Sequence, residues 1–212
     1  GSSAAQNVTT GTGFVAIGTK AGFAQVDHGY WVAIGYEALG GTATTNQGNG
    51  IAIGMRAMFE VKDGSSGVAI GNSALNYLVG GYSTAVGDSA GRYATGSFNT
   101  FVGNTAGAGA SSAPYASGER NVALGYGAYS SFTTGYRNVA IGDRAAAGTT
   151  TGHSGVYIGY LAGYGGNQSG NVAIGPEALF TANSNSNVAI GYQAGRYTTA
   201  NDGVWIGVGA GS

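Results

Sequence analysis

The sequence predicts an all-β protein, a parallel β-solenoid of twelve repeats of about 16 residues each. Three observations lead to this fold class. A VAIG-like string recurs along the chain, glycine supplies 43 of the 212 residues, and β-branched residues alternate with small ones around each string. Many glycines among β-branched and aromatic residues are typical of short strands joined by tight turns. No helical periodicity competes with this pattern.

The repeat is defined by the glycine that ends each VAIG-like string, called here the motif glycine. The motif glycines are Gly18, Gly35, Gly54, Gly71, Gly87, Gly103, Gly125, Gly142, Gly159, Gly175, Gly191 and Gly207. Their spacings are 17, 19, 17, 16, 16, 22, 17, 17, 16, 16 and 16 residues. A base period of 16 with small insertions indicates a solenoid in which each repeat forms one turn.

A strand is predicted immediately before each motif glycine. In all twelve repeats the third residue before it is Val, Ile or Thr, and the residue before it is Ile, Val or Leu. The residue between them is Ala in nine repeats, and the exceptions are Phe101, Tyr157 and Trp205. Alternation with period two places these positions on opposite faces of a strand. We expect the branched residues to form the dry core and the alanines to face outward.

Two further positions predict the turns. Alanine stands three residues after every motif glycine, which indicates a narrow interior. Asn, Gly or Ser stands four residues before ten of the twelve motif glycines, as expected for a corner with a left-handed backbone. Stacked asparagines there are expected to hydrogen-bond from turn to turn. Each turn is expected to hold two strands of about five residues and two corners.

The chain is expected to form one β-roll domain over residues 14–212 after a lead-in at 1–13. The opening Gly1-Ser2-Ser3 fits an expression remnant, so the lead-in is expected to be partly artificial. Solenoids normally carry atypical capping repeats, and neither end has one. We therefore expect a segment of a longer fibre.

Charge and composition exclude several functions. The formal net charge is −1 without a basic cluster, which argues against nucleic acid as a partner. No apolar run is long enough to span a membrane. His28 and His153 lie about seven turns apart, and Glu37 and Glu177 about eight, so no catalytic or metal-binding group is predicted. We expect a non-enzymatic protein without a cofactor, although carboxylates paired across subunits are an open alternative.

Self-association is expected on the strand face that carries the alanines. Along the rod this stripe would cover about 500 Å², the size at which an apolar patch marks an interaction site. We expect Ala140 and Ala173 to contact other copies, with Phe101, Tyr157 and Trp205 filling wider gaps near a symmetry axis. The alternative is a stripe of solvent-exposed alanine.

Candidate ligand-binding residues lie where the repeat is irregular. The segment 26–36 concentrates His28, Tyr30, Trp31 and Tyr36, and the longest interval, 103–125, contains Tyr115. Loops on a rigid scaffold often carry binding residues. The alternatives are insertions without a function and aromatic ladders that only stabilise the rod.

Some repeats resemble known families of fibrous proteins. The strings NVAIGYQAG (187–195), NVAIGPEAL (171–179), NVALGYGAY (121–129) and NVAIGDRAA (138–146) resemble the head repeats of trimeric autotransporter adhesins. They also resemble the NTAIGYQAG-like repeats of bacteriophage tail fibres and tailspikes. The resemblance covers about residues 14–211 and implies a left-handed β-roll assembled as a homotrimer. The 16-residue period and the Tyr-x-Ala-Gly segment favour the phage-fibre family.

This resemblance predicts a non-enzymatic attachment module of a phage tail fibre, located outside the cell as part of a virion. Three chains would present identical weak sites to a glycan or protein receptor on a bacterial surface, and avidity would supply the affinity. Three alternatives are the head of a bacterial surface adhesin, a rigid shaft that binds nothing, and a glycan-cleaving tailspike.

Overall fold

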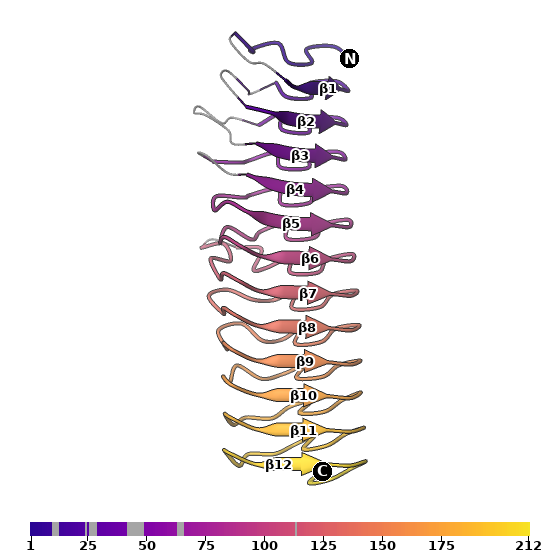
Figure 1. The fold of residues 1–212 in the computed structure, drawn as a ribbon, viewed down its shortest axis with the longest axis vertical. Helices are drawn as coiled ribbons and strands as arrows, with labels where there is room; N and C mark the ends of the chain where they lie inside the picture. Colours follow the sequence, from indigo (N-terminus) through magenta and orange to yellow (C-terminus); the bar gives the residue numbers. More distant parts are fainter. Residues whose placement is uncertain (10–12, 24, 26–28, 42–48, 63–65, 113) are drawn as a thin grey trace.

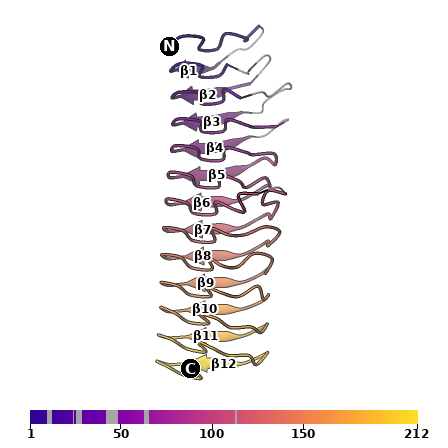
Figure 2. The same cartoon turned by 180° about the vertical axis from the view of Figure 1, so that it is seen from behind.

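The computed structural model describes residues 1–9, 13–23, 25, 29–41, 49–62, 66–112 and 114–212. Twelve strands form one parallel sheet in which each strand pairs with its neighbours in sequence order (Figures 1 and 2). The predicted parallel β-solenoid is confirmed. The strands are β1 (Val15–Ile17), β2 (Trp31–Ile34), β3 (Gly50–Ile53), β4 (Gly67–Ile70), β5 (Ser83–Val86), β6 (Thr100–Val102), β7 (Val122–Leu124), β8 (Val139–Ile141), β9 (Val156–Ile158), β10 (Val172–Ile174), β11 (Val188–Ile190) and β12 (Val204–Ile206).

The register of the sheet places equivalent residues of successive repeats over one another. We call each repeat of the solenoid a rung. Val139 of β8 pairs with Val156 of β9, and Ile141 pairs with Ile158. The 22-residue interval does not disturb this register, since Thr100 of β6 still pairs with Val122 of β7. The extra residues of this interval therefore lie between Gly103 and β7 without displacing either strand.

Each rung holds one strand, and the expectation of two strands is wrong for the described residues. The segment after each motif glycine contains left-handed residues, such as Glu37 (φ 54°) and Leu39 (φ 48°), which a strand cannot accommodate. Its backbone still bonds from rung to rung. Leu39 N–H donates to Ala57 O over 3.1 Å, and Met58 N–H donates to Ala74 O over 3.0 Å. The second wall of the roll is therefore a stack of turns with its own ladder of hydrogen bonds.

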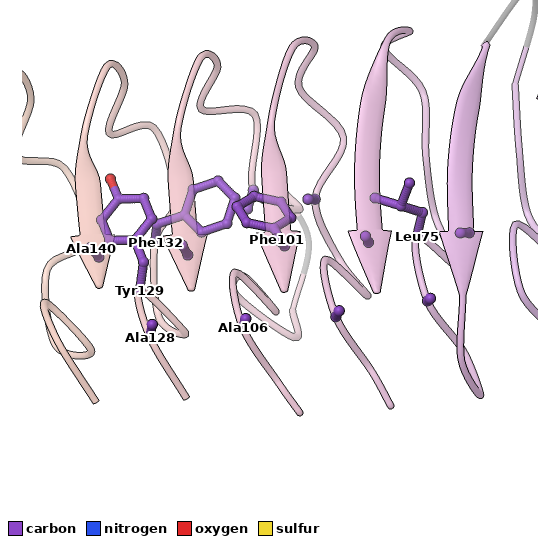
Figure 3. Packing of buried hydrophobic residues seen from close by; sticks show 14 of the residues in the cluster. Leu75, Phe101, Ala106, Ala128, Tyr129, Phe132 and Ala140 are labelled. Atoms are coloured by element: carbon purple, nitrogen blue, oxygen red, sulfur yellow. The ribbon is translucent and has the colours of Figure 1, made fainter. Parts of the chain in front are cut away.

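The two faces of the sheet are the reverse of the prediction. The central alanines point into the roll, where Ala140 and Ala173 are 0% exposed. The 24 side chains three residues and one residue before the motif glycines all point outward, and none of them is buried. The roll is thin because the alanine three residues after each motif glycine comes from the facing wall, as Ala106 and Ala128 do (Figure 3). Only a methyl group fits in most of the space between the walls.

Larger core residues are matched by glycine in the same rung. Phe101, Tyr157 and Trp205 replace the central alanine, and each is followed six residues later by Gly107, Gly163 and Gly211, respectively. A Cβ atom added to any of these glycines would collide with the ring of its own rung. Figure 3 shows the ring of Phe101 beside those of Phe132 and Tyr129 in the space between the walls. In these three rungs the missing side chain of the glycine offsets the volume of the ring.

Moving a large side chain from the strand to the facing turn of the same rung tests whether the large residue and the glycine compensate for each other. Tyr157→Ala is expected to cost about 3–5 kcal/mol by leaving a cavity, and Gly163→Leu alone to destabilise by collision with the Tyr157 ring. The double variant should recover most of that loss, because Leu39 and Leu179 occupy the same repeat position as Gly163 with φ of 48° and 49°. Urea unfolding of the three variants measures the coupling. Strictly additive losses would contradict the compensation.

Asparagines at the corner before the strand form the predicted ladder. Asn121 N–H donates to Asn99 Oδ1 over 2.9 Å, and Asn138 N–H donates to Asn121 Oδ1 over 3.0 Å. The left-handed residue of this corner is the one before the asparagine, such as Arg120 with φ 57°, and not the asparagine itself as predicted. The asparagine side chain can therefore point into the roll, where Asn121 is fully buried.

Residues 1–9, predicted as part of a lead-in, stack on the first rung. Ala5 N–H donates to Ala21 O over 2.8 Å, and Lys20 N–H donates to Ser2 O over 2.9 Å. Ala5 and Val8 also pack against the hydrophobic core. This segment follows the path that the turns after the motif glycines take in the other rungs.

Candidate functional site

The outward side of the sheet is an extended apolar surface. We call it the outer aliphatic face, defined by the residues three positions and one position before each motif glycine. Exposure is highest at the ends of the rod, where Ile17 is 57% and Ile206 68% exposed. Eleven strand spacings of about 4.8 Å make the face about 53 Å long, and three residues make it about 10 Å wide. Its area of about 500 Å² lies in the range that marks interaction surfaces.

The residue after the motif glycine extends this face along one margin. Exposed apolar side chains at this position are Tyr36, Met55, Tyr126, Tyr160, Tyr192 and Val208. Three successive rungs replace them by a polar group in which Asn72 Nδ2 donates to Asp88 Oδ1 over 2.9 Å and Asn104 Nδ2 donates to Asp88 Oδ2 over 3.4 Å. Tyr36, a predicted ligand-binding residue, is therefore one member of a repeated column.

A groove of about 620 Å³ lies along the opposite margin, where strands β2 to β5 begin. Its volume is typical of ligand-binding sites. None of the described residues that line it carries a charge. They are Gly13, Tyr30, Trp31, Val32, Asn49, Gly50, Ile51, Ser66, Gly67, Val68, Tyr82, Ser83 and Thr84.

The groove contains two of the predicted ligand-binding residues in different roles. Tyr30 is 70% exposed, whereas Trp31 is only 2% exposed and stacks on Phe14 with ring centroids 4.7 Å apart. Trp31 therefore serves mainly as a core residue. His28 lies outside the residues that the structure describes. Sequence reasoning missed Tyr82, which is 69% exposed and occupies the same repeat position as Tyr30, five residues before a motif glycine.

Tyr115 lies elsewhere, in a cluster of tyrosines on the other wall of the roll. Its ring centroid is 4.8 Å from that of Tyr77 and 5.7 Å from that of Tyr93. The insertion returns to the roll here, since Ala116 N–H donates to Tyr93 O over 3.0 Å. Tyr115 thus joins the aromatic stack, one of the two roles that the sequence left open for such residues.

The residues predicted to form a subunit interface lie inside the single chain. Phe101 is 0% and Tyr157 2% exposed, and Trp205 packs against the core while partly exposed. Burial raises the pKa of the Tyr157 hydroxyl to about 12. Ala140 and Ala173 are also buried in the single chain, so these two alanines, Phe101 and Tyr157 offer a partner no side-chain surface, whereas Trp205 stays partly exposed. The surface open to a partner is the outer aliphatic face.

The carboxylates that share a repeat position are both held by cations. Glu37 Oε2 lies 2.8 Å from Arg56 Nε, and Glu177 Oε2 lies 2.8 Å from Arg196 Nη2. Burial opposes ionisation of Glu37, but the hydrogen bond and charge of Arg56 lower its pKa overall. Among the described residues, no three acidic or histidine side chains are grouped so that they could hold a metal ion. That part of the chain also contains no helix long and apolar enough to cross a membrane.

The fold defines the class of this protein as a parallel β-solenoid repeat protein. Comparison with protein-family models, with curated proteins and with solved structures found no match.

Proposed function

We propose that this chain is a segment of an extracellular attachment fibre, most similar to a phage tail fibre, in which three copies associate through the outer aliphatic face. Its role is to present binding sites to a bacterial surface without chemical turnover. The observation that carries the proposal is the aliphatic face over all twelve strands, in which Thr84 and Thr100 are the two polar members.

The shape of this face favours association with copies of the same chain. Identical residue types recur at one strand spacing, so two rods aligned in parallel match along their whole length at once. A cyclic arrangement around an axis along the rod hides every copy of the face and closes the assembly. The number of three copies rests on the resemblance to trimeric fibre and adhesin repeats.

Self-association is tested by light scattering coupled to size exclusion. We expect a mass near three times 20.8 kDa for the chain. Replacing Val139 and Ile141 together by Asp should release monomers, because two carboxylates would be buried at the interface. Both side chains lie on the chain's own surface, so the circular dichroism spectrum should be retained.

The matched control for this experiment is Tyr197→Asp, which adds a charge at an exposed aromatic outside the outer aliphatic face. This variant should keep the mass of the assembly. A monomeric wild-type protein, or an assembly that survives both Asp substitutions on the face, would remove the basis of the proposal.

Attachment is tested by binding of the fluorescently labelled protein to a panel of bacterial cells. The assembled protein should bind at least about a hundredfold more tightly than the monomeric variant, because linked weak sites act together. Absence of binding to every strain would favour a rigid shaft. Shortened lipopolysaccharide or capsule chains after incubation would favour a glycan-cleaving tailspike.

A further inference from the structure

We propose that a pocket on the second wall of the roll binds a sugar residue that bears a carboxylate. The pocket has a volume of about 190 Å³ and is formed by the turns that follow strands β6 to β9 and the motif glycines after them. This size suits one sugar ring, since sites for larger ligands have volumes of about 300–1,000 Å³. The inference rests on the proposed attachment function and names the class of group that one of its sites recognises.

The pocket lies on the side of the chain that the proposed assembly leaves open. Its lining residues, with the exception of Tyr126, stand two, five or six positions after the motif glycines, in the turns that form the second wall. The outer aliphatic face belongs to the opposite wall, so copies that associate through it leave these turns in contact with solvent. Tyr126 borders the outer aliphatic face, and ligand binding is therefore assigned to the other lining residues.

Small residues hollow the second wall at this place. Gly127 stands in the column two positions after the motif glycines, between Thr105 and Arg144 of the neighbouring rungs. A Cβ atom added to Gly127 would lie 3.5 Å from Arg144 Cγ and 3.9 Å from Thr105 Oγ1, so these two side chains flank the notch. Further along the turn, Ala147 and Gly148 add no more than one methyl group to the lining. The shape of the pocket is therefore set by the small residues in the rungs of β7 and β8.

Arg144 brings a positive charge without an acidic partner to this notch. The structure describes every residue from 114 to 212, and within this range Arg144 makes no ion pair, not even with its neighbour Asp143. In contrast, Arg56 at the same repeat position pairs with Glu37 over 2.8 Å. A guanidinium presents a fork of N–H groups that matches a carboxylate, so Arg144 can bind an acidic ligand through two hydrogen bonds.

The other lining residues suit the ring and the hydroxyl groups of a sugar. Tyr164 is 37% exposed, and its ring stacks on Phe180 with centroids 5.4 Å apart, which holds it at one end of the pocket. Its apolar ring can pack on the C–H face of a sugar. Ser130 and Ser131 supply hydroxyl groups that donate to or accept from those of the ligand. A bare anion would use Arg144 alone, so these groups favour an acidic sugar over inorganic phosphate.

The test is titration of the assembled chain with the methyl glycosides of glucuronic acid and galacturonic acid, followed by NMR and calorimetry. Each is compared with its neutral counterpart, methyl glucoside or methyl galactoside, which differs only in the carboxylate. We expect at least one acidic sugar to bind and its neutral counterpart to bind at least about tenfold more weakly. Raising the salt concentration from about 0.05 M to about 1 M should weaken the binding, because salt screens exposed charges.

Two substitutions test the assigned residues. Arg144→Gln should weaken the binding at least about tenfold, the loss expected when a charged hydrogen-bond donor is removed. Gly127→Leu should abolish the binding by filling the notch. The fold accommodates leucine there, because Leu161 occupies the same repeat position with φ 53°. Circular dichroism checks that both variants retain the fold.

The matched control is Arg137→Gln, which removes the same charge from the same rung. Arg137 lies over the ring of Tyr136 at 5.7 Å from its centroid, as Arg144 lies over the ring of Tyr126 at 5.7 Å. Arg137 is exposed and does not line the pocket. This variant should therefore leave the affinity for the acidic sugar unchanged.

Several results would overturn the proposal. They are no binding of either acidic sugar at millimolar concentration, equal binding of the neutral sugars, or binding that both Arg144→Gln and Gly127→Leu retain. Equally tight binding of inorganic phosphate would make the pocket a site for small anions instead.

The sugar site and the assembly can fail separately. Because the pocket lies within one chain, the variant with Asp at positions 139 and 141 should bind the acidic sugar with unchanged affinity as a monomer. Loss of binding in that variant would contradict a site within a single chain. Light scattering measures the mass independently, so failure of the sugar site is distinguishable from failure of self-association.

Discussion

Replacing the motif glycine Gly125 by alanine is expected to prevent the solenoid from folding. Gly125 has φ 131°, and a Cβ atom there would lie 2.5 Å from the carbonyl oxygen and 2.8 Å from the carbonyl carbon of Gly142 in the next rung. The colliding atoms are backbone atoms, so relief requires the rungs to separate. The loss is expected to approach the whole stability of a typical domain, about 5–15 kcal/mol. Circular dichroism and soluble yield report the outcome.

Two other glycines provide controls for this experiment. Gly127→Ala places a Cβ 3.5 Å from the side chain of Arg144 at φ 59°, so it should cost only about 1–2 kcal/mol of left-handed strain. Gly207 has φ 123° with nothing within 4 Å of an added Cβ, so Gly207→Ala isolates the backbone conformation from the collision. Equal stability of the Gly125→Ala and Gly207→Ala proteins would show that the close approach of rungs is not the cause.

Asn138→Leu is expected to destabilise the protein by about 3–9 kcal/mol, from about 1–3 kcal/mol for each of three buried partners left without a hydrogen bond. Asn138 Nδ2 donates to Gly152 O and to the Tyr129 hydroxyl, both over 2.7 Å, and Asn138 Oδ1 accepts from Gly155 N–H over 2.9 Å. Leucine has a similar volume, so the substitution removes hydrogen bonds with little change in packing. The shift of the urea unfolding midpoint measures the loss.

The matched control is Asn183→Leu. Asn183 is exposed, and its Oδ1 accepts a hydrogen bond from Gln168 Nε2 over 2.6 Å. Water can replace that bond, so the expected change is within about 0.5 kcal/mol. If both variants unfolded at the same urea concentration, the buried asparagine ladder would contribute no special stability.

Which face of the sheet points inward could not be predicted from the sequence, and so the outer aliphatic face was missed. Alternation of Val, Ala and Ile separates two faces, but it does not say which one is inside. Large branched residues normally fill a core, and that expectation placed Ala140 outward. The second wall approaches Ala140 so closely that only a methyl group fits at this position, and Ala140→Asp is now expected to unfold the chain rather than only dissociate it. The outer aliphatic face could be identified only once the position of the facing wall was known.

The groove was predictable only in part for a related reason. The break in the period pointed to Tyr30, but nothing in the local sequence joined it to Tyr82, 52 residues later. Both tyrosines stand five residues before a motif glycine, so the repeat places them in one column, but only the structure shows that both are exposed beside one groove. The sequence alone shows that Gly107 follows Phe101 by six residues. Only the structure shows that the two residues occupy the same space between the walls.

The sequence by itself determined the parallel solenoid, the order and register of its strands, and the corner asparagine ladder. These features follow from a repeat whose motif glycines and asparagines must stack on their own copies in the next rung. The tertiary structure decided which face is buried, how many strands a rung holds and which exposed side chains meet at one groove. Those outcomes depend on the distance between the two walls and on which side chains stay exposed once the rungs stack, which no local pattern of residues encodes.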